Sequence, residues 1–144
     1  MSETQAGADH LRRLAASLAE AWNRHDLEGI LGHFSPGYAG LDVNDPVPHR
    51  GRDDLRTRAT RYLNAFPDLR LSFDAVLADR GRLAVLWTAR GTHRGSFMHI
   101  PPTHRTFEVR GVALLTVEDG LIRHGLFVWD TAGVLRALGL LPHL

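Results

Sequence analysis

The chain has 144 residues, 44% of them hydrophobic and 23% charged, and a formal net charge of +1. This length and composition predict one globular domain over residues 1–144 with an adequate core. There is no Cys, and all 17 basic residues are Arg, so there is no Lys either. These absences exclude disulfides, thiolate metal sites, Cys nucleophiles and Lys Schiff bases.

The distribution of charge and hydrophobicity excludes two further classes of partner. Arginines alternate with acids over residues 52–58 instead of forming one basic stripe, so nucleic-acid binding is not expected. The first ten residues are polar, and no window approaches about eighteen apolar residues, so no membrane contact is expected. A cytoplasmic protein is predicted. No Walker, Gly-x-Gly-x-x-Gly or Gly-x-Ser-x-Gly motif indicates a cofactor.

Hydrophobic periodicity predicts two helices at the start of the chain. The first has Asp9 as a plausible N-cap and ends near His25. Asp26 is predicted to cap a short second helix, which Ser35, Pro36 and Gly37 close. The residues that define these helices recur at steps of three and four: Leu11, Leu14, Leu18, Ala21, Trp22, Leu27, Ile30, Leu31 and Phe34.

The rest of the chain is predicted to hold one more long helix and a meander of strands. An irregular stretch from Tyr38 to Gly51 precedes a helix with arginines on its outer face, which Pro67 stops. The period then changes to two, and Asp119-Gly120 favours a hairpin turn. A last short helix covers Thr131 to Leu138 and ends at Gly139. The predicted strands are Leu69–Asp79, Leu83–His93, Thr106–Val117 and Leu121–Asp130.

Helices followed by strands predict an α+β fold in which N-terminal helices pack on a curved antiparallel sheet. Alternation along the last strand places His124 and Asp130 on one face, with Phe127 and Trp129 on the other. Both faces are substantially apolar. Because only one can cover the helices, the face with Phe127 and Trp129 is expected to bind a second copy, giving a homodimer through the open sheet face.

Seven short motifs occur in a characteristic order. They are Ala21-Trp22-Asn23 with His25-Asp26, Gly51, Ala65-Phe66-Pro67-Asp68-Leu69, Gly91-Thr92-His93-Arg94-Gly95, Ile100-Pro101-Pro102-Thr103, Glu118-Asp119-Gly120-Leu121-Ile122, and Asp130 followed by Gly133, Leu135, Leu138 and Gly139. Together they resemble the SnoaL-like polyketide cyclases (ester cyclases) of the NTF2-like superfamily. The resemblance covers nearly the whole chain. It implies a cone-shaped α+β fold enclosing a pocket, and a cofactor-free enzyme of secondary metabolism that cyclises an aromatic or polycyclic carbonyl compound by an intramolecular aldol reaction.

The same resemblance implies that Asp130, at the end of the last long strand, is the general acid/base. Its neighbours agree with this role, because Val128, Trp129 and an apolar helix are expected to desolvate the carboxylate partly. A partly desolvated carboxylate suits the transfer of a carbon-bound proton. The alternative is that Asp130 only caps the last helix.

Other polar residues are candidates for contacts with the substrate. His93, beside two glycines, could donate a hydrogen bond to a substrate carbonyl, or simply hold its loop together. His124 is a candidate for the pocket floor, with a core role as the alternative. Tyr38, Asp42 and Asn44 are expected at the pocket mouth, although turn chemistry also explains them. The remaining substrate-binding candidates are Trp87, Phe97 and His99.

The loop after the second strand contains His93, His99 and His104. Their spacing matches no HxH or HxxxH ligand pair, so no metal site is predicted. The family usually has Gly near His99 and His104, and often Gln at Ala137, so the loop and one polar contact differ here. Isomerisation, cofactor-independent hydroxylation and a non-catalytic ligand-binding or assembly module stay open as alternative functions.

Overall fold

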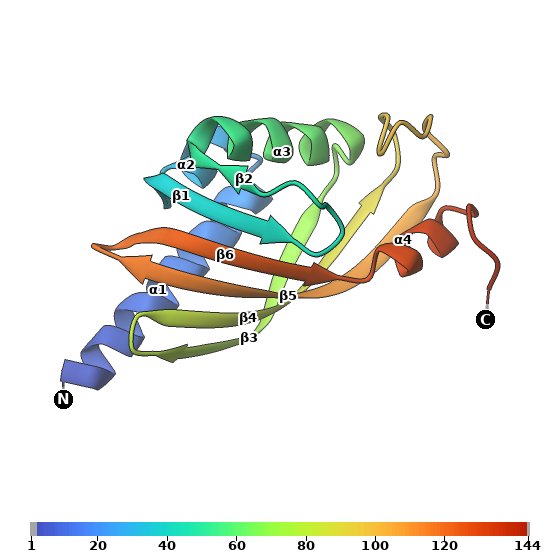
Figure 1. The fold of residues 1–144 in the computed structure, drawn as a ribbon. Helices are drawn as coiled ribbons and strands as arrows, with labels where there is room; N and C mark the ends of the chain where they lie inside the picture. Colours follow the sequence, from blue (N-terminus) through green and yellow to red (C-terminus); the bar gives the residue numbers. More distant parts are fainter. Residues whose placement is uncertain (1–2, 144) are drawn as a thin grey trace.

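The computed structural model describes residues 3–143. Its elements are, in chain order, α1 (Glu3–Asn23), α2 (Leu27–Leu31), β1 (Phe34–Asp42), β2 (His49–Arg50), α3 (Gly51–Ala65), β3 (Arg70–Asp79), β4 (Arg82–Thr92), β5 (Thr106–Glu118), β6 (Leu121–Trp129) and α4 (Thr131–Ala137). The strands form one curved sheet in the order β2-β1-β6-β5-β4-β3 (Figure 1). Helix α1 packs against β3 and α3 against β1, so the predicted α+β architecture is confirmed.

The predicted meander is confirmed, with strand ends within about one residue of the expected positions. Strands β3 to β6 pair antiparallel with their neighbours in sequence. At the β5–β6 hairpin, Asp119 and Gly120 have φ angles of 53° and 76°. Two positive φ angles match the right-handed twist of the flanking strands, which explains the Asp-Gly pair. Gly139, with φ of 80°, follows the last helix as expected.

The stretch that begins at Ser35 departs from the prediction. Residues expected to be breakers and loop belong to β1, which pairs parallel with β6, so the sheet is mixed rather than purely antiparallel. Pro36, Gly37 and Gly40 are poor strand formers and hide the strand in the sequence. Its pairing partner lies far along the chain, so no hairpin signal announces it.

Of the three aspartates considered as helix N-caps, the structure confirms Asp26 and Asp130 but not Asp9. Asp9 is not an N-cap, because α1 begins at Glu3, six residues earlier, and Asp9 lies inside the helix. Asp26 does cap α2, since its Oδ1 accepts a hydrogen bond from Gly29 N at 3.0 Å. Asp130 likewise caps α4 by accepting from Gly133 N at 2.9 Å.

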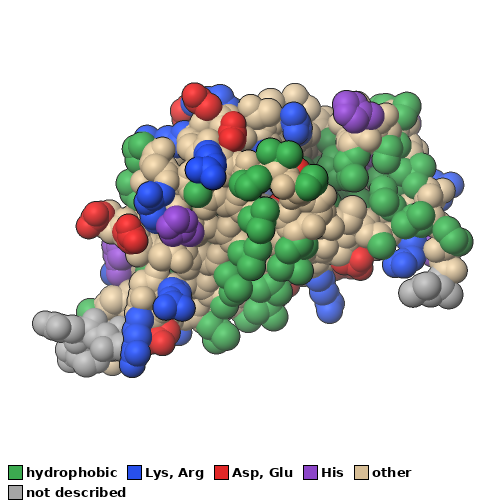
Figure 2. All heavy atoms as spheres, viewed as in Figure 1, with side chains coloured by type: hydrophobic (Ala, Val, Ile, Leu, Met, Phe, Trp, Pro, Cys, Tyr) green, Lys and Arg blue, Asp and Glu red, His purple; other side chains and the backbone are tan. Residues whose placement is uncertain are grey.

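The faces of β6 are the reverse of what the dimer prediction required. Phe127 and Trp129 lie opposite Ala113 and Gly111 of β5 and face the helices, so they are not an open surface. The outer face instead carries two cross-strand rows of aliphatic side chains, visible across the middle of the molecule in Figure 2. This outer apolar stripe consists of Leu77, Leu86, Val112, Leu114, Leu126 and Val128.

Side-chain hydrogen bonds fix the end of α1 onto the sheet and explain part of the motif there. Asn23 Nδ2 donates to Leu71 O at 2.8 Å, and Leu71 N donates to Asn23 Oδ1 at 2.7 Å. The His25 ring pairs with Leu69 O at 2.8 Å. These contacts hold α1 against β3 at one end of the sheet, while α3 packs against β1 near the other end of the same concave face. The space between the two helices and the sheet is where the cavity forms.

Candidate active site

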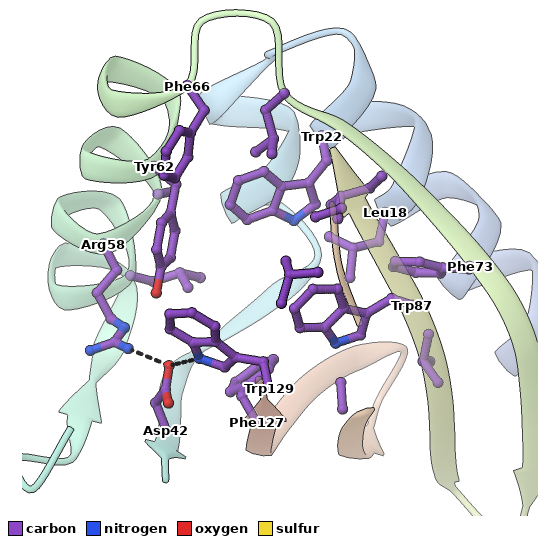
Figure 3. Close-up of a pocket in the computed structure, with 18 of the residues that line it drawn as sticks. Leu18, Trp22, Asp42, Arg58, Tyr62, Phe66, Phe73, Trp87, Phe127 and Trp129 are labelled. Carbon is purple, nitrogen blue, oxygen red and sulfur yellow. Dashed lines mark hydrogen bonds and ion pairs between the residues drawn. The ribbon is translucent and has the colours of Figure 1, made fainter. Parts of the chain in front are cut away.

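A cavity of about 190 Å³ lies between the concave face of the sheet and the helices. Aromatic rings face one another across it in Figure 3, where Trp22 of α1 and Trp87 of β4 lie opposite Tyr62 of α3 and Phe66, which directly follows that helix. The other apolar lining residues are Leu18, Phe34, Leu55, Ala59, Leu69, Leu71, Phe73, Val85, Ala89, Phe97, Phe107, Val109, Ala113, Leu115, Phe127, Trp129 and Val134. Such a lining suits a flat, ring-rich ligand.

One end of the cavity is polar, and Asp42 lies at its centre. Asp42 Oδ2 accepts a hydrogen bond from Trp129 Nε1 at 2.8 Å and from Arg58 Nη2 at 3.0 Å (Figure 3). Its Oδ1 accepts from Asn44 N at 2.9 Å. Arg58 Nη1 also binds Asp45 Oδ2 at 2.9 Å. Asp42 is only 4% exposed, so this carboxyl group is buried and does not lie on the surface.

Three elements must come together to build this polar end. Asp42 ends β1 and Trp129 ends β6, which is its parallel neighbour in the sheet. Arg58 and Tyr62 lie one turn apart on α3 and therefore project from the same side of that helix. Burial raises the pKa of the Tyr62 hydroxyl, which keeps its proton at neutral pH.

The polar end adjoins a second hollow, which we take as the mouth of the cavity. Five residues line both the cavity and this hollow: Asp42, Arg58, Tyr62, Phe97 and Trp129. The hollow is otherwise lined by Asn44, Asp45, Arg61, Ser96, Met98 and His99. A ligand entering here passes charged groups at the mouth and places its far end among aromatic rings.

His49 is a second buried polar residue in the cavity wall. It is 4% exposed, and its Nε2 pairs with the Tyr38 hydroxyl at 2.9 Å. Burial, followed by the charge of Arg58, lowers the pKa of His49 below its ordinary value of 6.5. The ring is therefore neutral at pH 7. Tyr38 itself is 1% exposed and lies behind His49 rather than on the cavity surface.

Several residues predicted from sequence do meet at this site. Trp87 and Phe97 line the cavity, and Asp42 stands at its polar end. Asn44 and His99 line the mouth, where Asn44 Nδ2 also donates to Trp129 O at 3.2 Å.

Asp130 and His124 lie outside the cavity. Asp130 is exposed and caps α4, so the expected desolvation of its carboxylate is not found. His124 is exposed at the outer face of β6, beside Thr116 of β5, and not on a pocket floor. Neither residue is among those that line the cavity or its mouth.

His93 organises its loop from a fully buried position. Its Nδ1 pairs with Thr103 Oγ1 at 3.0 Å and accepts from Thr103 N at 3.2 Å. Its backbone N donates to Arg105 O at 2.9 Å, while His104 N donates to His93 O at 2.8 Å. His93 does not line the cavity, so the loop-holding alternative describes its contacts. Within residues 3–143, no three potential metal-ligating side chains of His, Asp or Glu converge.

Sequence reasoning missed three residues of the site: His49, Arg58 and Tyr62. Arginines of the third helix were expected on its outer face, yet the Arg58 side chain is only 16% exposed. The pair Arg58 and Tyr62 has the i, i+4 spacing of one helical face, which is the signal that could have revealed it. His49 carries no such signal, because it stands in a two-residue strand.

The comparison with protein families agrees with these features. The family model for SnoaL-like polyketide cyclase matches residues 12–138. The chain belongs to this family. No helix among residues 3–143 is long and apolar enough to cross a membrane. A search of the curated proteins gives no match to the chain.

Solved structures place this SnoaL-like protein among bacterial relatives. It is similar to AclR, a candidate hydroxylase from Streptomyces galilaeus, at 31% identity and TM-score 0.84 over 96% of this chain and 89% of AclR. It is also similar to IdmH, a candidate polyketide cyclase from Streptomyces antibioticus, at 28% identity and TM-score 0.77 over 89% and 97% of the two chains. A Catenulispora acidiphila protein with a ketosteroid isomerase-like fold, 15% identical, has a TM-score of 0.75 over 89% and 93%. The expected NTF2-like fold is thereby confirmed.

Proposed function

We propose that this protein is a cofactor-independent enzyme that removes a proton from the carbon beside a carbonyl group in a ring-rich substrate. Intramolecular aldol cyclisation follows from the resulting enolate. The observation that carries this proposal is the contrast within the cavity. Asp42 is the only carboxylate among the described residues that line it, and it stands at one end of an otherwise largely apolar, aromatic chamber. Family membership supports the same class of chemistry.

The hydrogen bonds of Asp42 favour Oδ1 as the proton acceptor. Each carboxylate oxygen has two lone-pair positions. Oδ2 already accepts from Arg58 and Trp129, whereas Oδ1 accepts only from Asn44 N. Oδ1 therefore keeps one open position. The two donors on Oδ2 fix the carboxylate in the orientation that such proton transfer needs.

The reaction balances with this chain's own groups. Asp42 Oδ1 takes the proton from the substrate carbon, and the electron pair of that C–H bond forms the enolate. The enolate carbon then bonds to a second carbonyl carbon of the same molecule, whose oxygen becomes an alkoxide. Asp42 returns its proton to that alkoxide, so no oxidant or reductant is consumed.

Asp130 stays the alternative acid/base, because the family resemblance assigns the role to that position. One assay tests proton transfer and, when it is applied to variants of Asp42 and Asp130, decides between these two residues.

In D₂O, removal of a proton from C1 of 2-tetralone exchanges hydrogen for deuterium, which ¹H NMR follows without knowledge of the natural substrate. We expect the wild-type protein to accelerate this exchange well above the buffer rate. Exchange no faster than in buffer contradicts proton transfer as the function and favours a ligand-binding module.

Cofactor-independent hydroxylation is the second candidate, because the chain is 31% identical to a candidate hydroxylase. It begins with the same enolate, whose carbon would bond to dissolved O₂ and give a hydroperoxide once its outer oxygen is protonated. A two-electron reductant in solution, such as a thiol, would then cleave the O–O bond and leave a hydroxyl group on the carbon and one molecule of water. Oxygen-electrode measurements during exchange distinguish the two. Cyclisation and isomerisation consume no O₂, whereas hydroxylation consumes it in proportion to product.

We further propose that two copies associate through the outer apolar stripe. A two-fold contact sets a surface against itself, so the surface must be self-complementary. The stripe is apolar, with Leu77 64% and Leu114 47% exposed. A pair of opposite charges, Arg90 and Glu108 at 2.7 Å, lies further along the same two strands, β4 and β5. We expect a homodimer in sedimentation experiments. Leu114→Asp should give a monomer, whereas Ala16→Asp, on the exposed side of α1, should not.

A further inference from the structure

The pair formed by His49 and Tyr38 has a feature that the proposed reaction has not used. Among the described residues, His49 Nδ1 is buried and has no hydrogen-bond partner. The other ring nitrogen, Nε2, is occupied by Tyr38, which lies behind the cavity wall. Since the two ring nitrogens point away from each other, Nδ1 is directed away from Tyr38. A buried polar atom without a partner is rare in proteins and calls for an explanation.

The sheet is shaped to hold this pair. Gly40 of β1 lies between His49 of β2 and Gly125 of β6 in the strand register. A Cβ atom on Gly40 would overlap both the Tyr38 hydroxyl and His49 Nε2, and one on Gly125 would lie 2.9 Å from the Tyr38 hydroxyl. Two facing glycines on neighbouring strands therefore create the room in which the Tyr38–His49 hydrogen bond forms.

The hydrogen bond also decides which nitrogen carries the proton. Burial raises the pKa of the Tyr38 hydroxyl, so it keeps its hydrogen. Within residues 3–143, the described hydrogen bonds give that hydroxyl no acceptor other than His49 Nε2. Tyr38 thus donates to Nε2. The neutral imidazole must then carry its own hydrogen on Nδ1.

We propose that His49 Nδ1–H donates a hydrogen bond to the carbonyl oxygen of the bound compound and stabilises the negative charge that develops there. This inference rests on the proposed function and adds a second group to it. Asp42 removes the proton, while His49 holds the oxygen that receives the electron pair. A preorganised neutral donor in the wall of a largely apolar cavity is effective in this role.

The first test needs neither a variant nor a substrate. Long-range ¹H–¹⁵N NMR correlates ring protons with both imidazole nitrogens and shows which nitrogen is protonated. The His49 signals are identified by their absence in a His49→Gln spectrum. At pH 7.5 we expect a protonated Nδ1 and an unprotonated Nε2. The opposite tautomer, or a doubly protonated ring, overturns the proposal.

The second test uses two variants that each keep one half of the imidazole. The amide of Gln reaches the position of Nε2, so His49→Gln keeps the Tyr38 contact and loses Nδ1. The amide of Asn stands near the position of Nδ1, so His49→Asn keeps the proposed donor and loses Tyr38. The probes are 2-acetylnaphthalene and 2-isopropenylnaphthalene, which differ only in C=O against C=CH₂. Calorimetry gives the dissociation constants of both.

The ratio of the two dissociation constants isolates the carbonyl contact. We expect His49→Gln to lower the preference for the ketone by about fivefold to tenfold, and His49→Asn to keep it within about threefold of wild type. A purely structural His49 predicts the reverse order, because Gln preserves the internal contact. Equal ketone preference in all three proteins also overturns the proposal.

The two proposals fail separately. If 2-tetralone exchange does not occur but the ketone preference depends on His49 as described, the carbonyl contact stands and proton transfer falls. If exchange depends on Asp42 but the ketone preference ignores His49, the reverse holds.

Discussion

Two aspartates end neighbouring parallel strands of the sheet and have opposite surroundings. Asp42 closes β1, pairs in register with the inward-facing Phe127 of β6, and is 4% exposed. Asp130 follows the end of β6 and is exposed. It stands three residues beyond Phe127, and an odd step along a strand reverses the face. The two aspartates therefore lie on opposite faces of the sheet, and only Asp42 faces the cavity.

The partners of the two carboxylates differ as much as their exposure. Asp42 is bound by Arg58 of α3 and Trp129 of β6, so its position depends on the whole tertiary structure. Asp130 accepts from Gly133 N, three residues along the chain, which is a local helix cap. A strand-end aspartate is thus not a functional signal by itself. What distinguishes Asp42 from Asp130 is that the side chains that donate hydrogen bonds to Asp42 come from distant parts of the sequence.

Replacing each carboxylate by its amide gives the largest expected contrast. Asp42→Asn keeps the size of the side chain and removes its basicity, so 2-tetralone exchange should fall by a factor of about 100 to 10,000. Asp130→Asn should leave the rate near wild type, since Asn caps a helix about as well as Asp. Initial rates by NMR measure both. The reverse result would make Asp130 the acid/base and remove Asp42 from the mechanism.

Truncation to alanine tests the same pair through stability. Asp42→Ala leaves Trp129 Nε1–H and Asn44 N–H without their acceptor and removes one of two partners of Arg58. Asp45 still pairs with Arg58, so we expect a loss of about 2–4 kcal/mol, somewhat below the range of about 3–5 kcal/mol for a broken buried pair. Asp130→Ala should cost about 1 kcal/mol, the value of a helix cap. Urea denaturation gives both free energies, and equal losses would contradict the contrast.

Gly111 and Val112 are adjacent residues of β5 that face opposite sides of the sheet, so substitutions at these positions should affect the cavity differently. A Cβ on Gly111 would overlap the Trp87 indole, so Gly111→Ala should push Trp87 into the cavity. We expect a loss of about 1–3 kcal/mol from overpacking, with weaker binding of 2-acetylnaphthalene. Val112→Ala acts on the outer face and should leave that affinity unchanged. Calorimetric titration of the two variants checks this, and equal affinities would refute the inward position of Gly111.

The smallest effect concerns pH. Burial, and after it the charge of Arg58, lowers the pKa of His49 in the folded state, so the unfolded chain binds this proton more tightly. The free energy of unfolding should therefore decrease as pH falls below the ordinary value of 6.5, and level off below the folded pKa. Each unit of lowering corresponds to about 1.4 kcal/mol. The stability gap between wild type and His49→Gln, from urea curves at pH 8 to 5, should shrink accordingly; parallel curves would contradict it.

The fold was predictable where its signals are local. Strands β3 to β6 follow one another through hairpins, and both their alternation and the Asp-Gly turn can be read directly from neighbouring residues. Strand β1 could not be found this way, because Pro36 and two glycines lower its strand propensity and its partner β6 is remote. The sequence also could not show which face of β6 turns toward the helices, since both of its faces are apolar.

The site was predictable in part. Tyr38, Asp42 and Asn44 were expected at the pocket mouth, and of these Asp42 and Asn44 line it while Tyr38 lies behind His49. The other substrate-binding candidates, Trp87, Phe97 and His99, also line the cavity or its mouth. The prediction for Asp130 relied on that pattern, and its surroundings came out exposed. His49 was missed because its role depends on contacts between elements, whereas the i, i+4 spacing of Arg58 and Tyr62 lies within one helix and could have revealed that pair.

The parallel pairing of β1 with β6 has a kinetic consequence. The bond between Asp42 and Trp129 joins residues 87 positions apart, whereas the hairpins of the meander close short loops. Distant closures cost more chain entropy and come later in folding. We therefore expect the aromatic chamber to form on the meander first, with the Asp42 and His49 groups arriving when β1 and β2 dock. A chain arrested before that step would have an aromatic cavity able to bind a hydrocarbon, but it would lack the Asp42 and His49 groups that the proposed reaction needs.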